Sequence, residues 1–213
     1  MKYETYIFDM DGTILDTIED LTVTTNYAME KMGYPKHTIE EVKWFVGNGI
    51  MMLIKRAVPE GTSEEDIKRT HTFFMEHYKD HCNDKTGPYE GIIELLNKLK
   101  AADKKLAVVS NKADGPVKVL AQEIFPGLFD VAIGERPGIN KKPARDMVDE
   151  AIKQLGADRD KTVYIGDTNV DFETAKNSEL DCILVSWGFR GREFIEQYDA
   201  EYYVDRPEEI INI

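Results

Sequence analysis

Two aspartates separated by one residue stand out near the amino terminus, in the segment Phe8-Asp9-Met10-Asp11-Gly12-Thr13. The apolar residues before them have strand character, and because side chains alternate along a strand, Asp9 and Asp11 are expected to point the same way. Two carboxylates about 4 Å apart repel by roughly 4 kcal/mol at an effective dielectric of about 20. A divalent cation or a shared proton would offset that repulsion. The pair predicts such a site, although a plain strand followed by an Asp-Gly turn would look the same.

Two other polar groups follow strand-like or turn segments further along the chain. Ser110-Asn111 follows the apolar run Leu106–Val109, and a hydroxyl with an amide can donate hydrogen bonds to a phosphoryl oxygen. Lys142 precedes Pro143, which fits the first position of a helix, where amide dipoles favour an anion. Taken alone, each of these groups is more often a turn or a solvated surface feature.

The last polar group is the segment Gly166-Asp167-Thr168-Asn169-Val170-Asp171, which follows the apolar run Thr162–Ile165. A helix that starts near Thr168 would place Asp167 and Asp171 about one turn apart, facing one site. Asp167 could instead cap that helix. Because oxygen-rich ligand sets suit Mg²⁺, which takes only a few carboxylates, the pattern favours metal ligation.

These groups need a scaffold, and the hydrophobic pattern predicts one. Short apolar runs bounded by turns alternate with helical patterns such as Ile92–Leu99 and Met147–Leu155, which indicates a Rossmann-like α/β fold with a parallel sheet flanked by helices. Ligands of such sheets bind beyond the carboxyl ends of the strands, so the polar groups should converge. The predicted strands are Tyr6–Phe8, Leu106–Val109, Val131–Ile133, Thr162–Ile165 and Cys182–Val185.

The segment 16–85 interrupts this alternation, because it contains no convincing strand. Asp16 and Glu19 resemble a capping box at its start. We therefore predict two domains: an α/β core of residues 1–15 and 86–213, and an inserted all-helical domain of residues 16–85 whose two connections act as hinges. Glycine and proline breaks divide the insert into predicted helices at 16–32, 39–46, 49–58 and 63–82.

Composition limits the class of function. The 213 residues are 42% hydrophobic and 31% charged, as in a soluble globular protein. No apolar run approaches the ~20 residues that span a bilayer and no signal peptide is visible, so a cytoplasmic location is expected. Cys82 and Cys182 are too few for a disulfide framework. The net charge of −13 argues against nucleic acid as a partner, so a bound phosphate would need a local cationic pocket.

The order DxDGT, Ser, Lys, GDxxxD resembles the motif set of the haloacid dehalogenase (HAD) superfamily of phosphotransferases. The resemblance covers nearly the whole chain, including a helical cap domain inserted after the first motif. Arg145 departs from relatives, which often have a second proline there. Within the superfamily the chain is similar to the phosphoglycolate phosphatase subfamily, through Asp16–Leu21, Val46–Gly49, Val109–Lys112 and Ser186–Arg190.

The resemblance implies a role for each motif residue. Asp9 would be the nucleophile that forms an aspartyl-phosphate, and Asp11 the general acid and then the base. The presence of Asp11 favours phosphoryl over carbon–halogen chemistry, since dehalogenases of the superfamily lack it. Mg²⁺ would be held by Asp9, the main-chain carbonyl of Asp11 and Asp167, with Asp171 in support. The phosphate-binding set would be Ser110, Asn111, Lys142, Gly12 and Thr13.

The inserted helices are expected to select the substrate. Gly47-Asn48-Gly49 is flexible enough to approach the site, and Arg56, like Lys43 and Lys55, could meet a substrate carboxylate. Trp44-Phe45 is expected to belong to the core of the insert. The four histidines show no metal-binding spacing supported by a second cluster.

The resemblance therefore implies a Mg²⁺-dependent phosphatase for a small phosphate monoester, with 2-phosphoglycolate as the first choice. A phosphosugar mutase of the β-phosphoglucomutase type is an alternative, although similar mutases usually carry His where this chain has Leu21. Nucleotide and pyrophosphate substrates stay open, and a non-catalytic phosphate-binding regulatory module is the least favoured alternative. The expected partner is a small phosphorylated metabolite, without nucleic acid or membrane; monomer and homodimer both stay open.

Overall fold

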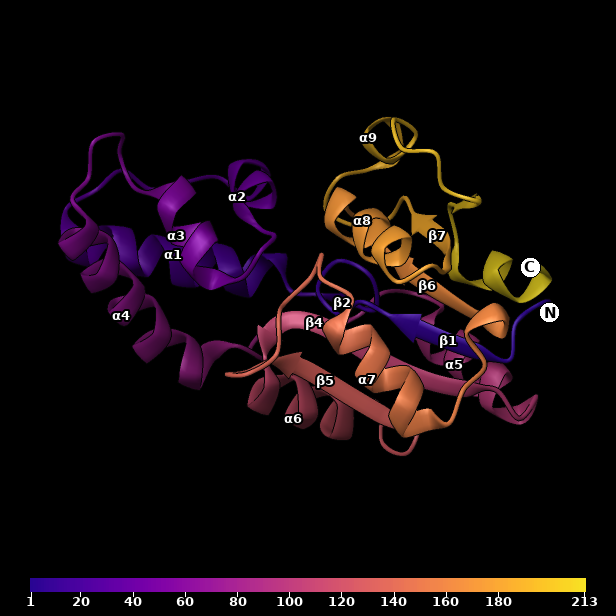
Figure 1. The fold of residues 1–213 in the computed structure, drawn as a ribbon. Helices are drawn as coiled ribbons and strands as arrows, with labels where there is room; N and C mark the ends of the chain where they lie inside the picture. Colours follow the sequence, from indigo (N-terminus) through magenta and orange to yellow (C-terminus); the bar gives the residue numbers. More distant parts are fainter. The chain divides into compact units, whose positions relative to one another are not determined.

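The chain folds into two compact units in a computed structural model that describes residues 1–213. One unit, here called the core unit, consists of Met1–Leu15 and Pro88–Ile213; the other, the helical unit, is Asp16–Gly87 (Figure 1). The second boundary lies two residues beyond the one that we predicted at 85/86.

A six-stranded parallel sheet forms the centre of the core unit, in the order β5-β4-β1-β6-β7-β8. This confirms the predicted α/β class. Strand β1 lies in the middle, with Phe8 in register with Val108 of β4 and Ile165 of β6. The carboxyl ends of these three strands therefore share one edge. The strands are β1 (Thr5–Phe8), β4 (Lys105–Ala113), β5 (Val131–Glu135), β6 (Thr162–Gly166), β7 (Asp181–Val185) and β8 (Tyr202–Val204).

Both faces of the sheet are buried, which explains why its strands are apolar throughout. Phe8 packs into a cluster with Leu96 of α5 and Leu120 of α6, whereas its neighbour Ile7 packs on the other face with Met147 of α7. Figure 1 shows these helices on the two sides of the sheet. The helical segments of this unit are α5 (Ile92–Ala101), α6 (Asp114–Ile124), α7 (Asp146–Leu155), α8 (Asn169–Asn177), α9 (Arg192–Ile195) and the 3₁₀ turns η1 (Arg159–Lys161) and η2 (Pro207–Asn212).

The helical unit contains four helices close to their predicted positions: α1 (Ile18–Met32), α2 (Ile39–Phe45), α3 (Ile50–Ala57) and α4 (Glu64–His81). The predicted capping box of Asp16 and Glu19 is wrong. Thr17 is the N-cap residue and makes no side-chain cap bond. Asp16 belongs instead to the short strand β2 (Leu15–Asp16), and its carboxylate accepts from the N–H of Ile18 at 3.3 Å. A capping box forms instead at Thr38 and Glu41 before α2.

The prediction that Trp44 belongs to the core of the insert is also wrong, since its side chain is 57% exposed. Helix α2 has one buried residue, Val42, and a residue two positions further along a helix points away from that face. Phe45 is half-buried and packs edge-on against His37.

The two connections between the units pair with each other. Strand β2 (Leu15–Asp16) forms a two-stranded sheet with β3 (Gly87–Pro88). Within the helical unit the buried carboxylate of Asp20 accepts hydrogen bonds from the N–H groups of Lys85 and Thr86, at 3.0 and 2.8 Å, and from the Thr86 hydroxyl. The return segment is thereby fixed to the first helix.

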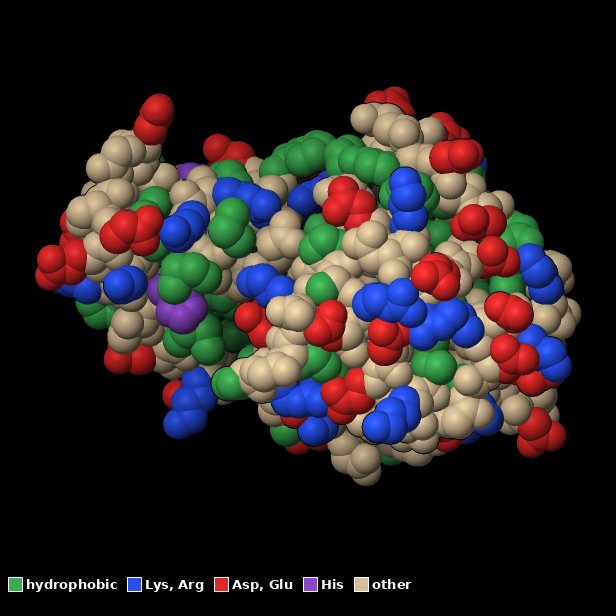
Figure 2. Space-filling model, in the orientation of Figure 1, with side chains coloured by type: hydrophobic (Ala, Val, Ile, Leu, Met, Phe, Trp, Pro, Cys, Tyr) green, Lys and Arg blue, Asp and Glu red, His purple; other side chains and the backbone are tan.

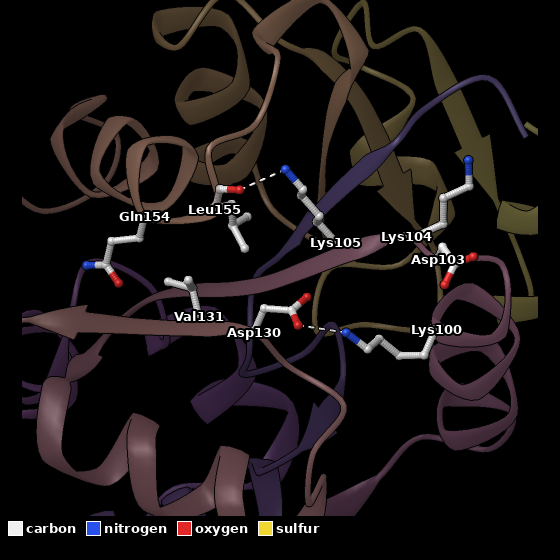
Figure 3. A pocket seen from close by; sticks show the side chains of 8 residues that line it. All are labelled: Lys100, Asp103, Lys104, Lys105, Asp130, Val131, Gln154 and Leu155. Carbon is white, nitrogen blue, oxygen red and sulfur yellow. Dashed lines mark hydrogen bonds and ion pairs between the residues drawn. The ribbon is translucent and has the colours of Figure 1, made fainter.

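A hollow of about 410 Å³ lies at the amino ends of β4 and β5, the edge of the sheet opposite to Asp9 (Figure 3). Lys105 donates from its Nζ to the carbonyl of Leu155 at 2.8 Å, and Lys100 pairs with Asp130 at 2.7 Å. Both lysines therefore already bind groups of the protein itself. Ligands of parallel sheets bind at the other edge.

The surface carries charged side chains of both signs (Figure 2). On the face drawn in Figure 2, acidic and basic side chains are interspersed. No helix combines the length and the apolar character needed to cross a membrane. Cys82 and Cys182 do not form a disulfide, and Cys182 is buried.

Candidate active site

The polar groups that follow separate strands meet at one edge of the sheet. Asp9 follows β1, Asp167 follows β6, and Asp171 lies in the first turn of α8. One carboxylate oxygen from each of these three buried residues lies within 4.8 Å of the others. The convergence that the strand pattern predicts is therefore present in the structure.

Lys142 joins two of these carboxylates. Its Nζ lies 2.7 Å from Oδ1 of Asp9 and 2.7 Å from Oδ1 of Asp171, and it donates to the hydroxyl of Tyr164 at 3.0 Å. The side chain is 3% exposed. A single buried ammonium thus neutralises part of the charge of two buried acids.

The main chain at Lys142 differs from the prediction. Pro143 is not the first residue of a helix, because residues 141–145 form a turn and α7 begins at Asp146. The Lys142–Pro143 peptide bond is cis. Helix dipoles therefore do not account for the place of Lys142; the side chain of Asn111 holds it, by accepting from Lys142 N at 2.8 Å and donating to Lys142 O at 3.0 Å.

Asn111 is accordingly oriented toward the main chain of Lys142, whereas the sequence predicts a side-chain amide that faces a phosphoryl group. The hydroxyl of Ser110 accepts from the N–H of Lys112 at 3.2 Å and keeps its own proton to donate. Both residues lie in β4, which continues four residues beyond the predicted end at Val109.

Asp167 is fixed by neighbours from two loops, the one after β1 and the one after β7. Its carboxylate accepts from the N–H of Phe189 at 2.8 Å and from the hydroxyl of Thr13 at 3.3 Å. A Cβ atom at Gly12 would lie 2.5 Å from Asp167 Oδ2, and one at Gly188 would lie 2.3 Å from Asp167 Cβ. Gly12 also has a φ of +89°, so a glycine is required there for both conformation and space.

Asp171 and Tyr164 complete the buried network. Asp171 Oδ2 accepts from the N–H and the hydroxyl of Thr168, at 3.1 and 2.7 Å. Thr168 is therefore the N-cap residue of α8, and the alternative that Asp167 caps this helix is wrong. The hydroxyl of Tyr164 donates toward Oδ1 of Asp171 at 3.3 Å.

The electrostatics of the cluster leave an excess of negative charge. Burial raises the pKa of Asp9 to about 7, with further contributions from the charges of Asp171 and Asp11, against the opposing effect of Lys142. Burial and the charges of Asp171 and Asp9 hold the pKa of Asp167 well above its usual range. Burial opposes the charge of Lys142, but Asp171 and Asp9 outweigh it and raise the pKa of the lysine. Three clustered carboxylates, of which only Asp9 and Asp171 contact a lysine, fit a divalent cation, which would relieve this repulsion.

Asp11 has a different partner. Its Oδ1 lies 2.7 Å from Nζ of Lys112, whose side chain is 5% exposed. The sequence motifs predict neither Lys112 nor Tyr164 as a site residue, although Lys112 lies within the segment Val109–Lys112. A lysine two positions after Ser110 in an otherwise apolar strand is the signal that could have identified the first; a tyrosine in a buried strand gives no comparable signal.

The candidate substrate-selecting residues lie in the helical unit, around the loop between α2 and α3. Gly47, Asn48 and Gly49 all have positive φ angles. Arg56 donates from one guanidinium nitrogen to the carbonyls of residues 45, 46 and 47, at 2.8, 3.3 and 3.1 Å. The guanidinium therefore fixes this loop. Lys43 and Lys55 pair with Glu40 and Glu64.

Known proteins are similar to this chain in sequence and share its fold. A family model described as haloacid dehalogenase-like hydrolase matches residues 6–185. A phosphoglycolate phosphatase of Nitrosococcus oceani is 30% identical over 99% of this chain and 96% of its own length. A pyrophosphatase PpaX of Listeria welshimeri is 28% identical over 100% of this chain and 96% of its own. A crystal structure from Lactobacillus delbrueckii subsp. bulgaricus, described as a candidate phosphoglycolate phosphatase, is 44% identical with a TM-score of 0.94, over 99% of this chain and 97% of that one.

The matched family model spans most of the chain and includes all four motifs of the site. The chain therefore belongs to the haloacid dehalogenase-like hydrolases. Its similarity to phosphoglycolate phosphatases extends over nearly its full length.

Proposed function

We propose that the protein is a Mg²⁺-dependent phosphatase that hydrolyses a small phosphate monoester, with 2-phosphoglycolate as the first substrate to test, through an aspartyl-phosphate on Asp9. The observation that carries the proposal is the buried arrangement in which Lys142 contacts both Asp9 and Asp171 while Asp167 lies within the same cluster. Relatives named phosphoglycolate phosphatase support the choice of substrate.

The residues divide the reaction into two displacements. Lys142 holds Oδ1 of Asp9, which leaves Oδ2 to attack phosphorus and form the acyl-phosphate. Asp11 then protonates the departing alcohol oxygen and, in the second displacement, takes a proton from the attacking water. A covalent route of this kind replaces one difficult step by two easier ones.

Asp9, Asp167 and the main-chain carbonyl of Asp11, with Asp171 in support, would hold Mg²⁺, which when bound neutralises charge on the transferring phosphoryl group. The remaining groups bind that phosphoryl group. Lys142 supplies positive charge, Ser110 supplies a hydroxyl donor, and the main chain of Asn111 supplies an N–H donor. The N–H groups of Gly12 and Thr13, which the sequence predicts as phosphate-binding, instead donate to the carbonyls of Leu15 and Met10 at 2.9 and 3.3 Å.

The helical unit acts as a cap in this proposal. A cap excludes water while the acyl-phosphate forms and selects substrates by shape. The loop of Gly47, Asn48 and Gly49, held by Arg56, is the segment that we assign to this role.

Pyrophosphate is a second candidate substrate, because relatives named pyrophosphatase PpaX are 27–28% identical over the full chain. The mutase alternative is weaker. Leu21 is buried, at 3% exposure, in α1, and it has no group that could carry a proton.

The test is phosphate release by the purified protein from a panel that contains 2-phosphoglycolate, a sugar phosphate, a nucleoside monophosphate and pyrophosphate, each with Mg²⁺. Asp9→Asn should lower kcat by orders of magnitude while the protein stays folded. An acid-quenched reaction of the wild type should carry a hydroxylamine-sensitive phosphoryl group on the peptide that contains Asp9.

Asp103→Asn is the matched control. Asp103 is exposed, lies far along the sheet from the site and has a positive φ that asparagine tolerates, so its turnover should equal that of the wild type. Turnover retained by Asp9→Asn would show that Asp9 is not the nucleophile. Tight Mg²⁺ binding without turnover of any ester would favour a regulatory module.

A further inference from the structure

The fold buries two basic side chains, Lys112 and Lys142. Lys112 lies in the last part of β4, at the carboxyl edge of the sheet. Its ammonium lies 2.7 Å from Oδ1 of Asp11, and the N–H of the same residue donates to the hydroxyl of Ser110, which fixes the local turn. Nothing in the proposed chemistry uses this side chain.

The burial of the Lys112 ammonium group requires an explanation. Moving a lysine out of water is unfavourable, pairing with a carboxylate offsets that cost only where the geometry is good, and an apolar side chain at the end of a strand would avoid the cost altogether. The partner, Asp11, keeps 17% of its side chain exposed, whereas Lys112 keeps 5%. The pair therefore does not contribute to the apolar core, and its position beside the reacting residues indicates a role in binding.

The two buried lysines contact different aspartates of the proposed reaction centre. Lys142 contacts the nucleophile Asp9 and is thus on the side of the transferring phosphoryl group. Lys112 contacts Asp11, which in the proposed mechanism faces the oxygen of the leaving alcohol. Its ammonium is therefore one hydrogen-bond contact away from the group that meets the organic part of the substrate.

We propose that Lys112 binds an anionic group on the leaving side of the substrate and so selects esters whose leaving group carries negative charge next to the bridging oxygen. This inference rests on the proposed function. A carboxylate on the carbon beside the ester oxygen has this chemistry, and so does the second phosphate of pyrophosphate. Neutral alcohols of the same size lack it.

The charge distribution supports this assignment. The site already contains Asp9, Asp11, Asp167 and Asp171, in a chain of net charge −13, so an additional substrate carboxylate would be repelled unless a cation met it. Arg56 of the helical unit does not serve as this cation in our proposal, because its guanidinium already donates to three main-chain carbonyls of the loop before α3. Inside a water-poor site a charge contact is also stronger than at the surface.

The test compares two esters that differ only in this charge: 2-phosphoglycolate and 2-hydroxyethyl phosphate. The wild type should show a kcat/KM about tenfold or more higher for 2-phosphoglycolate, as expected for one charge-assisted contact. Lys112→Met should lower kcat/KM for 2-phosphoglycolate and largely remove this preference, mainly through KM. Lys112→Arg, which keeps the charge, should retain it.

Lys118→Met is the matched control, because Lys118 is an exposed lysine of the same unit that pairs with Asp114; both esters should react as in the wild type. An equal fall for both esters in Lys112→Met would show that the lysine acts only by positioning Asp11 and would overturn the inference. Equal kcat/KM values of the wild type for the two esters would also overturn the inference, and this result does not depend on how any variant folds. No release from any ester would overturn the proposed function itself, and this inference with it.

Discussion

Tyr164→Phe removes a single oxygen atom from the interior of the site. The Tyr164 side chain is fully buried on β6. Its hydroxyl accepts from Nζ of Lys142 at 3.0 Å and lies 3.3 Å from Oδ1 of Asp171. The ring remains in phenylalanine, so the packing of the strand is unchanged and the variant tests only the hydrogen bonds.

The expected loss follows from the charge of the partner. A hydrogen bond to an ionised group contributes about 1.5–3 kcal/mol, and about 1.4 kcal/mol corresponds to a tenfold change in rate. Lys142 keeps its contacts to Asp9 and Asp171, so it stays in the site but is less well oriented. We expect kcat to fall by about tenfold to a hundredfold, with a smaller change in KM.

Tyr6→Phe is the control for this experiment. Tyr6 is fully buried on the adjacent strand β1, and its hydroxyl has no hydrogen-bond partner. Removing it should leave kcat unchanged and stability unchanged or slightly higher, because a buried polar group without a partner is unfavourable. Phosphate release and thermal unfolding would be measured on both variants.

Two results would contradict the reasoning. If Tyr164→Phe retains kcat within about twofold, the carboxylates alone position Lys142. If the two variants lose activity equally, the effect comes from disturbed packing of the central strands.

Three further outcomes are expected. Dialysis against a chelator should reduce phosphate release to background without changing the far-ultraviolet circular dichroism, and Mg²⁺ should restore it; full activity in chelator would contradict the acidic metal site. Gly12→Ala should lower the free energy of unfolding by about 1–3 kcal/mol, because alanine is strained at the positive φ of this position. It should also lower activity, because the added Cβ would displace Asp167. An unchanged melting temperature would contradict the expected strain. Hydrogen bonds from Lys2 and Tyr3 lower the pKa of Asp181, so the stability that they contribute should be present above about pH 4 and lost as the pH falls through the folded pKa. The difference in melting temperature between wild type and Asp181→Asn should accordingly disappear in acid, and a constant difference would contradict the linkage.

Local patterns predict most of the sheet and of the helices. Runs such as Thr162–Ile165 are apolar because both faces of the sheet are covered, and the four helices of the insert are separated by glycine and proline breaks that the structure retains. Strand β8 was missed because Tyr202–Val204 is only three residues long and lies at the edge of the sheet.

The site was predictable only as far as strand ends determine it. Asp9 and Asp167 follow neighbouring parallel strands, so their proximity is a consequence of topology. The hydrogen bonds of Asn111 and Tyr164 depend on where the turn at Lys142 passes, and no local pattern specifies that path. For the same reason the helix start was misplaced at Pro143: proline fits both the first turn of a helix and the turn that precedes α7.

The central place of β1 has a consequence for how the chain folds during synthesis. Its Phe8 is in register with Val108 and Ile165, so β1 can pair on its two sides only after β4 and then β6 have been synthesised. Pairing over such long sequence separations slows folding and leaves apolar strands uncovered meanwhile. A nascent chain of this protein should therefore depend on chaperones until β6 has emerged.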